Sequence, residues 1–289
     1  MSELMAYFSD PAVDELVVNG GFGMWLVLGD SLRAASSPFA HAEELAMWAQ
    51  ELARQHGIRL DPLSGAAGGS LPEQAFRWHC VLPPLAPDGA LFSLRRHRFD
   101  SLCISDFRAC PNLMEKLRGI MERRESLLIA GPTGGGKTTL LAALLRLHAA
   151  SERVILVESL SELPLPSPCS VRLLERRPNL EGIGAVSLTR LVQEALRLRP
   201  DRLVIGEIRG HEAGAFCESL MSGHEGVMST IHASNPHDAI ARLSFLASAG
   251  GLRGGPNAWP GLELHVVMLE RGIPPRLVSL SSHRFVPSG

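Results

Sequence analysis

The sequence predicts an α/β fold built on a mostly parallel sheet, preceded by a smaller α+β domain. Strand and helix patterns alternate from Glu115 onward, and the apolar runs in that part of the chain are continuous. Continuous apolar strands are typical of parallel sheets, because crossover helices bury both faces of such a sheet. The first hundred residues instead contain short apolar runs separated by turn signals. We therefore expect an N-terminal domain over residues 1–99 and a second domain over residues 100–289.

The N-terminal domain is expected to combine several strands with one helix. The stretch "VDELVVNGGFGMWLVLGD" has two apolar runs around "NGGFG", a composition typical of a hairpin turn. A helix is predicted over residues 41–57, and its apolar face consists of Leu45, Trp48, Ala49 and Leu52. The composition of "LDPLSGAAGGSLPEQ" is typical of a loop, whereas "FRWHCVLPPL" and "ALFSLRRHRF" predict two further strands. We expect the joint between the domains within residues 99–111.

The second domain is expected to alternate strands and helices. The predicted strands are "SLLIA", "RVILVES", "RLVIGE" and "VMSTIH". Helices are predicted for "KTTLLAALLRLHAA" and for "SLTRLVQEALRLRP", whose apolar residues fall on one stripe. Near the end, "LHVVMLERGIPPRLVSL" predicts a hairpin that turns at residues 272–275. This order indicates a mostly parallel sheet wrapped by helices.

A phosphate-binding loop is predicted by "GPTGGGKT", which fits G-x-x-x-x-G-K-[ST] without a mismatch. An apolar strand precedes the motif and a helix follows it, as the motif requires. Glycines allow backbone N–H groups to curl around phosphates, and a helix N-terminus favours negative charge. Lys137 is expected to reach the β- and γ-phosphates of ATP, and the Thr138 hydroxyl is expected to bind Mg²⁺. The predicted nucleotide-binding residues are Gly131, Pro132, Thr133, Gly134, Gly135, Gly136, Lys137, Thr138 and Thr139.

Two glutamates follow buried strands at the edge where ligands bind in such sheets. Glu158 ends "VILVE", and Glu207 follows "RLVIG". Either residue taken alone could be a solvated strand end or a helix cap. With a phosphate-binding loop on the same sheet, we expect Glu207 to activate the attacking water and Glu158 to contribute to the Mg²⁺ site.

An ordered set of motifs over nearly the whole chain resembles the secretion, or "traffic", ATPases of type II and type IV secretion systems and type IV pili. These motifs are "VVNG", "LDP", "LPPLAPDG", "GPTGGGKTTLLAALL", "VESLSEL", "ERRPNLEGIGAVSLTRLVQEALRLRPDRLVIGEIRGHEA" and "SGHEGVMSTIHASNPHDAIARL". The "GEIRG" and "IHASNP" forms look most like the CpaF/TadA branch, which drives tight-adherence pili. The resemblance implies an N-terminal domain joined to a RecA-like ATPase domain, assembled as a homo-hexamer with ATP between the domains.

The resemblance also implies roles for residues outside the phosphate-binding loop. Glu158 falls in the acidic box of the family and Glu207 in its Walker-B motif. His224 and His232 fall in the His box, which implies that they sense the γ-phosphate. Arg209 belongs to the "GEIRG" element, where it is expected to contribute to the nucleotide site or to an intersubunit contact.

In the N-terminal domain, Arg95 of "LFSLRRH" resembles the arginine finger of the family, and Arg96 is the reserve choice. The chain departs from the family pattern at Ser159, where the acidic box usually has Asp. A second departure is the Gly/Pro-rich "ASAGGLRGGPNAWPG", which puts the usual C-terminal helices in doubt.

His224 and His232 have two other interpretations. They could ligate a metal, although no third ligand follows at a metal-like spacing. They could also be core histidines with satisfied hydrogen bonds, which is the commoner fate of a lone histidine. We favour the γ-phosphate role that the resemblance implies, above all for His232, which ends a predicted strand beside the active-site edge.

Composition and charge limit the partners and the compartment. The formal net charge of −2 and the single Tyr give no sign of a basic, aromatic channel for nucleic acid. The five cysteines form no CxxC pair, which favours a reducing cytoplasm. The first residues contain acids where a secretory signal has bases, and no apolar run approaches the about 20 residues of a membrane span. We expect a cytoplasmic protein that reaches the inner membrane peripherally, through a platform protein.

The function favoured by these observations is a hexameric, ATP-hydrolysing motor that powers pilus assembly or protein secretion. One alternative is a RecA-like nucleic-acid motor, since that core fold is shared. A second alternative is an ATP-gated adaptor that hydrolyses weakly, which the missing carboxylate at Ser159 favours.

Overall fold

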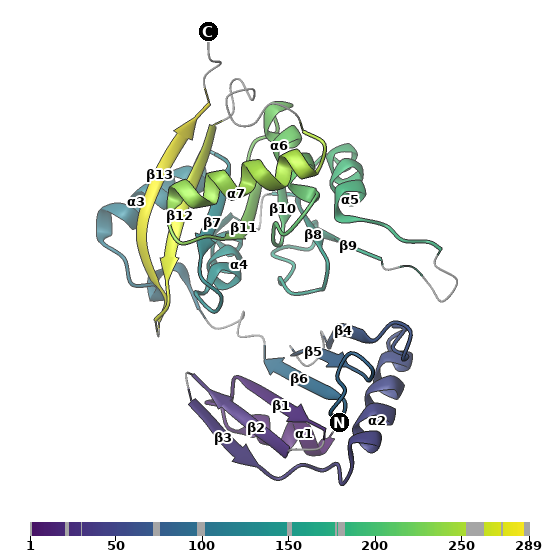
Figure 1. Cartoon of the computed structure of the whole chain (residues 1–289). Coiled ribbons are helices and arrows are strands. Elements are labelled where there is room, and N and C mark those ends of the chain that lie inside the picture. Colours follow the sequence, from purple (N-terminus) through teal and green to yellow (C-terminus); the bar gives the residue numbers. More distant parts are fainter. Residues whose placement is uncertain are drawn as a thin grey trace. The chain divides into compact units, whose positions relative to one another are not determined.

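The computed structural model describes residues 2–20, 23–29, 31–71, 76–96, 102–148, 152–176, 178, 183–252, 263–272 and 274–285. The chain forms two compact units, one over residues 1–98 and the other over residues 99–178 and 182–289. Figure 1 shows the elements of both units with their labels. Each unit has its own sheet and its own core.

The first unit is a six-stranded antiparallel sheet with the strand order β3-β2-β1-β6-β5-β4. Its strands are β1 Glu15–Asn19, β2 Gly23–Leu28, β3 Ser31–Ala35, β4 Ala66–Leu71, β5 Phe76–Val81 and β6 Leu91–Arg96. Its helices are α1 Ser2–Ala6, the 3₁₀ turn Tyr7–Ser9 and α2 Ala42–Gln55. The hairpin of β1 and β2 is confirmed by their antiparallel register, while Gly21 and Phe22 of its turn lie outside the described residues.

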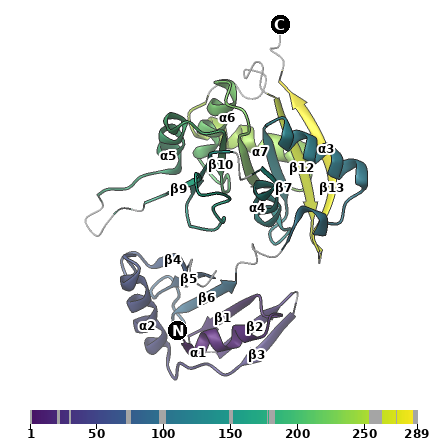
Figure 2. The same cartoon turned by 180° about the vertical axis from the view of Figure 1, so that it is seen from behind.

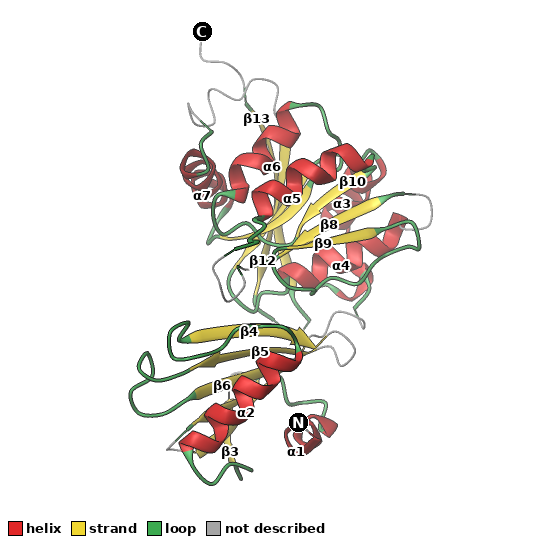
Figure 3. Cartoon of the chain, turned by 90° about the vertical axis from the view of Figure 1, so that its right-hand side faces the viewer, coloured by secondary structure: helices red, strands yellow, loops and turns green. Residues whose placement is uncertain are grey.

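Helix α2 packs on one face of this sheet (Figure 3), and the predicted stripe explains why. Leu45, Ala49 and Leu52 are buried with the aromatic side chains Trp78 and Phe92 of the sheet. The apolar face is therefore the one that the 3.6-residue period predicted. Trp48, also on the predicted face, packs edge-on against the Phe92 ring at 5.0 Å between centroids.

The prediction of a loop over residues 60–74 is wrong for the central part of that range, which forms strand β4. Its glycines argued against a strand, yet two of them are needed for the close approach of β5. A Cβ at Gly68 would lie 2.8 Å from the Trp78 carbonyl oxygen, and a Cβ at Gly69 would lie 2.9 Å from the Trp78 indole nitrogen. Glycine in the interior of a strand often marks such a close contact.

The second unit is a seven-stranded sheet with the order β13-β12-β7-β11-β10-β8-β9. Its strands are β7 Leu127–Gly131, β8 Val154–Glu158, β9 Val171–Leu174, β10 Arg202–Ile205, β11 Met228–His232, β12 Glu263–Glu270 and β13 Arg276–Arg284. Every neighbouring pair is parallel except β12 and β13, which form the expected terminal hairpin. The central strands β7 and β8 are buried along their whole length, so the predicted α/β class with a mostly parallel sheet is confirmed.

Helices cover both faces of this sheet. The helices are α3 Pro111–Glu122, α4 Lys137–His148, α5 Leu188–Ala195, α6 Glu212–Met221 and α7 Pro236–Ala249, with 3₁₀ turns at Ile104–Asp106 and Leu196–Leu198. One core contains residues of α3 and α4, and the other contains residues of α5, α6 and α7. Figure 1 shows α7 in front of the sheet, and Figure 2 shows α3 and α4 on its opposite side.

Two expectations concern the C-terminal part and the membrane. Helix α7 extends into the start of the Gly/Pro-rich stretch at residues 247–249, whereas residues 253–261 of that stretch lie outside the described residues. Within the described part of the chain, we find no helix whose length and apolar character would let it cross a bilayer.

Candidate nucleotide-hydrolysis site

The phosphate-binding loop joins the carboxyl end of β7 to the first turn of α4. Gly134 and Gly136 have φ angles of +72° and +82°, a region that other residues rarely adopt. A Cβ at Gly136 would also lie 2.6 Å from the Pro275 ring, which belongs to the turn between β12 and β13. Arg271 of the same turn donates to the Thr133 carbonyl oxygen at 2.9 Å. The terminal hairpin therefore fixes the loop from its outer side.

Lys137 opens α4, and its side chain is buried inside the loop. Its Nζ donates to the carbonyl oxygens of Gly131 at 3.2 Å and Pro132 at 2.9 Å, and lies 3.0 Å from Nδ1 of His232. Burial lowers the pKa of Lys137 to about 8, and the nearby Glu207 carboxylate offsets only part of this shift. The ammonium is thus held at the phosphate-binding position by acceptors that a phosphate could replace.

Four charged or titratable side chains, from the start of α4, the end of β11 and the turn after β10, form a continuous row of contacts. Lys137 meets His232 Nδ1, and His232 Nε2 lies 2.9 Å from Oε1 of Glu207. Oε2 of Glu207 lies 2.5 Å from Nη2 of Arg209. The structure therefore brings together four of the predicted site residues, Lys137, Glu207, Arg209 and His232, at one edge of the sheet.

The His232 ring connects the two ends of this row. A lysine ammonium can only donate, so Nδ1 of a neutral ring accepts from Lys137 and Nε2 carries the proton that faces Glu207. Burial and then the Lys137 charge lower the pKa of His232, which favours the neutral ring. Oε1 of Glu207 is buried and has no hydrogen bond of good geometry within the described part of the chain. A carboxylate oxygen has more than one lone pair, so Oε1 can accept a further hydrogen bond in addition to its contact with His232.

The backbone around Glu207 is held by the strands on both sides of β10. Gly206 donates to the Val157 carbonyl oxygen of β8 at 3.0 Å, and Ile208 donates to the Thr230 carbonyl oxygen of β11 at 2.9 Å. The Thr230 hydroxyl adds a bond of 2.9 Å to the Gly206 carbonyl oxygen. Sequence patterns gave no sign of Thr230, because its role depends on which strands are neighbours.

The residues at this edge fit the binding of a nucleotide triphosphate with Mg²⁺. The loop offers a buried ammonium, glycines in the left-handed region and the N-terminus of the 12-residue helix α4, all of which favour an anion. The half-buried hydroxyl of Thr138 follows Lys137 directly and supplies an oxygen ligand. A cavity of about 860 Å³ opens beside the loop, and its lining includes Pro132, Thr133, His232, Asn235, Arg242 and Glu270.

Glu158 ends β8 as expected, but its partners differ from those of a metal ligand. Oε2 pairs with Arg172 at 2.8 Å, and Oε1 accepts backbone N–H groups of Glu162 at 3.1 Å and Leu163 at 2.8 Å. Burial raises the pKa of Glu158, while Leu163 and Arg172 oppose that shift. The carboxylate anchors the loop after β8, and its charge is neutralised by Arg172, a partner that the sequence patterns did not reveal.

His224 does not lie at the edge of the sheet that holds the phosphate-binding loop. It precedes β11, whereas His232 ends β11 opposite Gly131 in the register of β7. The five residues of β11 alone span about 13 Å. The prediction that both histidines face the γ-phosphate is thus supported by position only for His232. Nδ1 of His224 is buried without a hydrogen-bond partner in the residues that the structure describes.

The two candidates for the arginine finger, Arg95 and Arg96, differ in their contacts within the first unit. Arg96 donates to the carbonyl oxygens of Phe8 and Pro11, and its guanidinium lies 5.2 Å from the centre of the Phe8 ring. Arg95 is exposed on β6. The reserve choice, Arg96, is therefore engaged by residues of its own unit, and the role of Arg95 stays a prediction.

The lowered pKa of Lys137 predicts that nucleotide affinity falls in alkaline solution. Phosphates bind the charged ammonium, so the bound form holds a proton that the free form loses as the pH rises through about 8. We expect the Kd of a fluorescent ATP analogue to be level between pH 7 and 7.5 and to rise by up to about tenfold per pH unit above 8. Lys137→Arg, which stays charged, is the control and should give a flat profile. A level Kd up to pH 9.5 in the wild type would contradict this.

Comparison with known proteins identifies a family and several relatives of this chain. Residues 83–254 match the sequence pattern of the family described as "Type II/IV secretion system protein". A putative conjugal transfer protein of Mycobacterium tuberculosis is 38% identical over 247 residues, covering 82% of this chain and 70% of that protein. Protein VirB11 of Agrobacterium fabrum is 28% identical over 281 residues, and the match covers 86% of this chain and 80% of VirB11.

Among solved structures, the ATPase DotB of Legionella pneumophila has a similar fold. The TM-score is 0.66 at 18% identity, and the match covers 98% of this chain and 79% of DotB. The phosphate-binding loop, the glutamate after β10 and the histidine that ends β11 all lie within the matched residues 83–254. The chain belongs to the family of type II/IV secretion system proteins.

Proposed function

We propose that this chain is an ATP-hydrolysing motor of a secretion or pilus-assembly machine. The observation that carries the proposal is the row of contacts from Lys137 through His232 to Glu207, at the edge where the phosphate-binding loop lies. Such a row links the group that binds phosphate to the group that would activate water. The relatives with conjugal transfer and VirB11 names support the assignment to secretion.

The geometry supports the following division of work. ATP supplies the phosphoryl group, and Mg²⁺ would neutralise its charge while the Thr138 hydroxyl holds the ion. Lys137 would exchange its two carbonyl acceptors and His232 for phosphate oxygens. Glu207 Oε1, the carboxylate oxygen with an open acceptor position, would take the proton of the attacking water.

Movement of Lys137 would reach the catalytic carboxylate through His232. Once the ammonium turns to phosphate, Nδ1 of His232 loses its donor, and the ring is free to change its contact with Glu207. His232 would in this way report the presence of phosphate, as the resemblance to the family implies. Nucleotide-dependent domain movement would then transmit the work to the export machinery.

The finer features of the proposal are a homo-hexamer of the tight-adherence pilus type and a platform protein at the inner membrane. Arg95, which lies in the first unit of the chain, would act as the arginine finger of a nucleotide-hydrolysis site. We expect native mass spectrometry to give a mass of six chains in the presence of a slowly hydrolysed ATP analogue. A single chain at every nucleotide and protein concentration would contradict the hexamer. Stimulation of turnover by single-stranded DNA alone would instead favour a nucleic-acid motor.

One observation favours the weakly hydrolysing adaptor as a second candidate. Glu158 is neutralised by Arg172, and Ser159 follows it where the family usually has Asp. The metal shell would then depend on Thr138 and water, which is a sparse set of protein ligands for Mg²⁺. Measured turnover of the purified protein distinguishes the motor from the adaptor.

A further inference from the structure

The turn after β10 is fixed by a carboxylate that the ATPase chemistry does not use. Glu212, the first residue of α6, is buried. Its Oε1 accepts the backbone N–H groups of Arg209 at 2.5 Å and Gly210 at 2.8 Å. A buried carboxylate with two backbone donors is a strong local restraint. The backbone that carries the Arg209 side chain is therefore held in place.

From this turn the Arg209 guanidinium reaches back to Glu207. Nη2 lies 2.5 Å from Oε2 of Glu207, whereas Oε1 faces His232. The pairing with Glu207 raises the pKa of Arg209, and the charges of Glu162 and Glu212 act in the same direction. The two oxygens of Glu207 thus have different surroundings, because Oε2 is paired with a cation and Oε1 is buried beside the His232 ring.

We propose that Arg209 is a positioning residue, which holds Oε2 of Glu207 so that Oε1 points to the attacking water. This inference rests on the proposed ATPase function and deepens it. It differs from the expectation that Arg209 contributes to the nucleotide site or to a contact between subunits. The observation that carries it is the ion pair between Arg209 and Glu207 within one chain.

A positioning residue of this kind has a kinetic signature. Without Arg209 the Glu207 side chain can turn among its rotamers, and a base displaced by about 1 Å can lose about 100-fold in rate. Nucleotide binding depends on the loop and on Lys137, which Arg209 does not touch. We therefore expect Arg209→Ala to lower kcat by about 10- to 100-fold, with KM for ATP within about twofold of the wild type.

The decisive test is a double-mutant cycle with Glu207→Gln, read as steady-state phosphate release from MgATP by the full chain. Because Arg209 acts through Glu207, Arg209→Ala should change the residual rate of Glu207→Gln by less than about twofold. Arg209→Lys, which keeps a cation, should recover part of the lost kcat. Arg190→Ala is the matched control, since Arg190 is an exposed arginine bound to Glu194 at 2.7 Å outside the site, and it should leave kcat unchanged.

Other results would overturn the inference. If Arg209→Ala lowered kcat by the same factor in the wild type and in Glu207→Gln, Arg209 would act independently of the Glu207 carboxylate. A raised KM with unchanged kcat would assign Arg209 to nucleotide binding. If the wild type hydrolyses ATP and Arg209→Ala matches it, the inference fails and the ATPase function stands. If the wild type releases no phosphate, the proposed function fails and this inference fails with it.

Discussion

Glu207→Gln should bind ATP as tightly as the wild type and release phosphate at least about 100-fold more slowly, because a general base contributes about 10²- to 10⁴-fold to a rate. The amide keeps the shape of the side chain and loses the basic oxygen. The backbone at this position is held by β8 and β11, so the substitution should leave the sheet unchanged. Lys137 and the loop, which would bind the phosphates, stay intact.

The measurement pairs a binding titration with phosphate release for the same preparations. Glu225→Gln is the matched control. Glu225 is exposed and precedes β11, at the end of that strand opposite to the phosphate-binding loop, so this variant should behave as the wild type. Loss of ATP binding in Glu207→Gln would mean that the carboxylate holds the loop or the metal. Phosphate release at the wild-type rate would remove Glu207 from catalysis.

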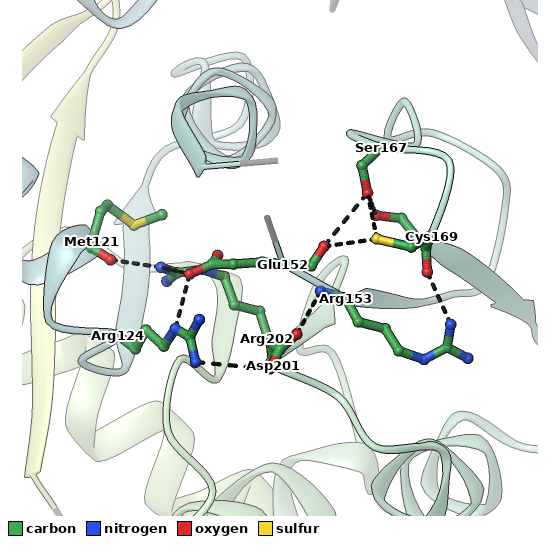
Figure 4. A network of polar contacts seen from close by, with 9 residues as sticks. Met121, Arg124, Glu152, Arg153, Ser167, Cys169, Asp201 and Arg202 are labelled. Carbon is green, nitrogen blue, oxygen red and sulfur yellow. Dashed lines mark hydrogen bonds and ion pairs between the residues drawn. The ribbon is translucent and has the colours of Figure 1, made fainter. Parts of the chain in front are cut away.

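Glu152→Ala should destabilise the second unit by about 3–5 kcal/mol, the range for leaving a buried charge unpaired. Glu152 and Arg202 are both buried, and they form an ion pair through Nε and Nη2 (Figure 4). Arg202 Nη2 also donates to the Met121 carbonyl oxygen at 2.6 Å, and Arg124 reaches Glu152 at 2.9 Å. Burial would raise the pKa of Glu152, but Arg202 and Arg124 together lower it.

Urea unfolding followed by far-UV circular dichroism would measure the loss. Substituting both partners, Glu152→Leu with Arg202→Met, should recover most of the stability, because a buried ion pair can be replaced by apolar packing at little cost. Glu194→Ala removes an exposed partner of Arg190 and should cost less than about 1 kcal/mol. A loss below about 1 kcal/mol in Glu152→Ala would contradict the importance of this pair.

The sequence was sufficient for the parts of the fold that depend on local patterns. Residues 127–131 and 154–157 are apolar throughout, and they lie in strands that are buried on both faces. The motif at residues 131–138 specifies glycines, a lysine and a threonine at fixed positions, so both the loop and its functional residues could be predicted from it. Glu207 follows β10 and His232 ends the neighbouring parallel strand β11, so the topology of the sheet explains why they lie close together.

Other features depend on contacts between segments far apart in the chain. Arg202 is buried at the start of β10, where Glu152, 50 residues away in the chain, pairs with it. Strand β4 has a loop-like composition, and only the packing of Trp78 explains its glycines. The partner of Glu158 is Arg172 on the next strand, which no spacing rule indicates.

Steady-state phosphate release from MgATP by the purified wild-type chain tests the central claim most directly. The account predicts turnover that requires Mg²⁺, saturates with ATP and falls at least about 100-fold in Glu207→Gln. A wild-type protein that binds ATP tightly and releases phosphate no faster than Glu207→Gln would contradict the account and favour an ATP-gated adaptor.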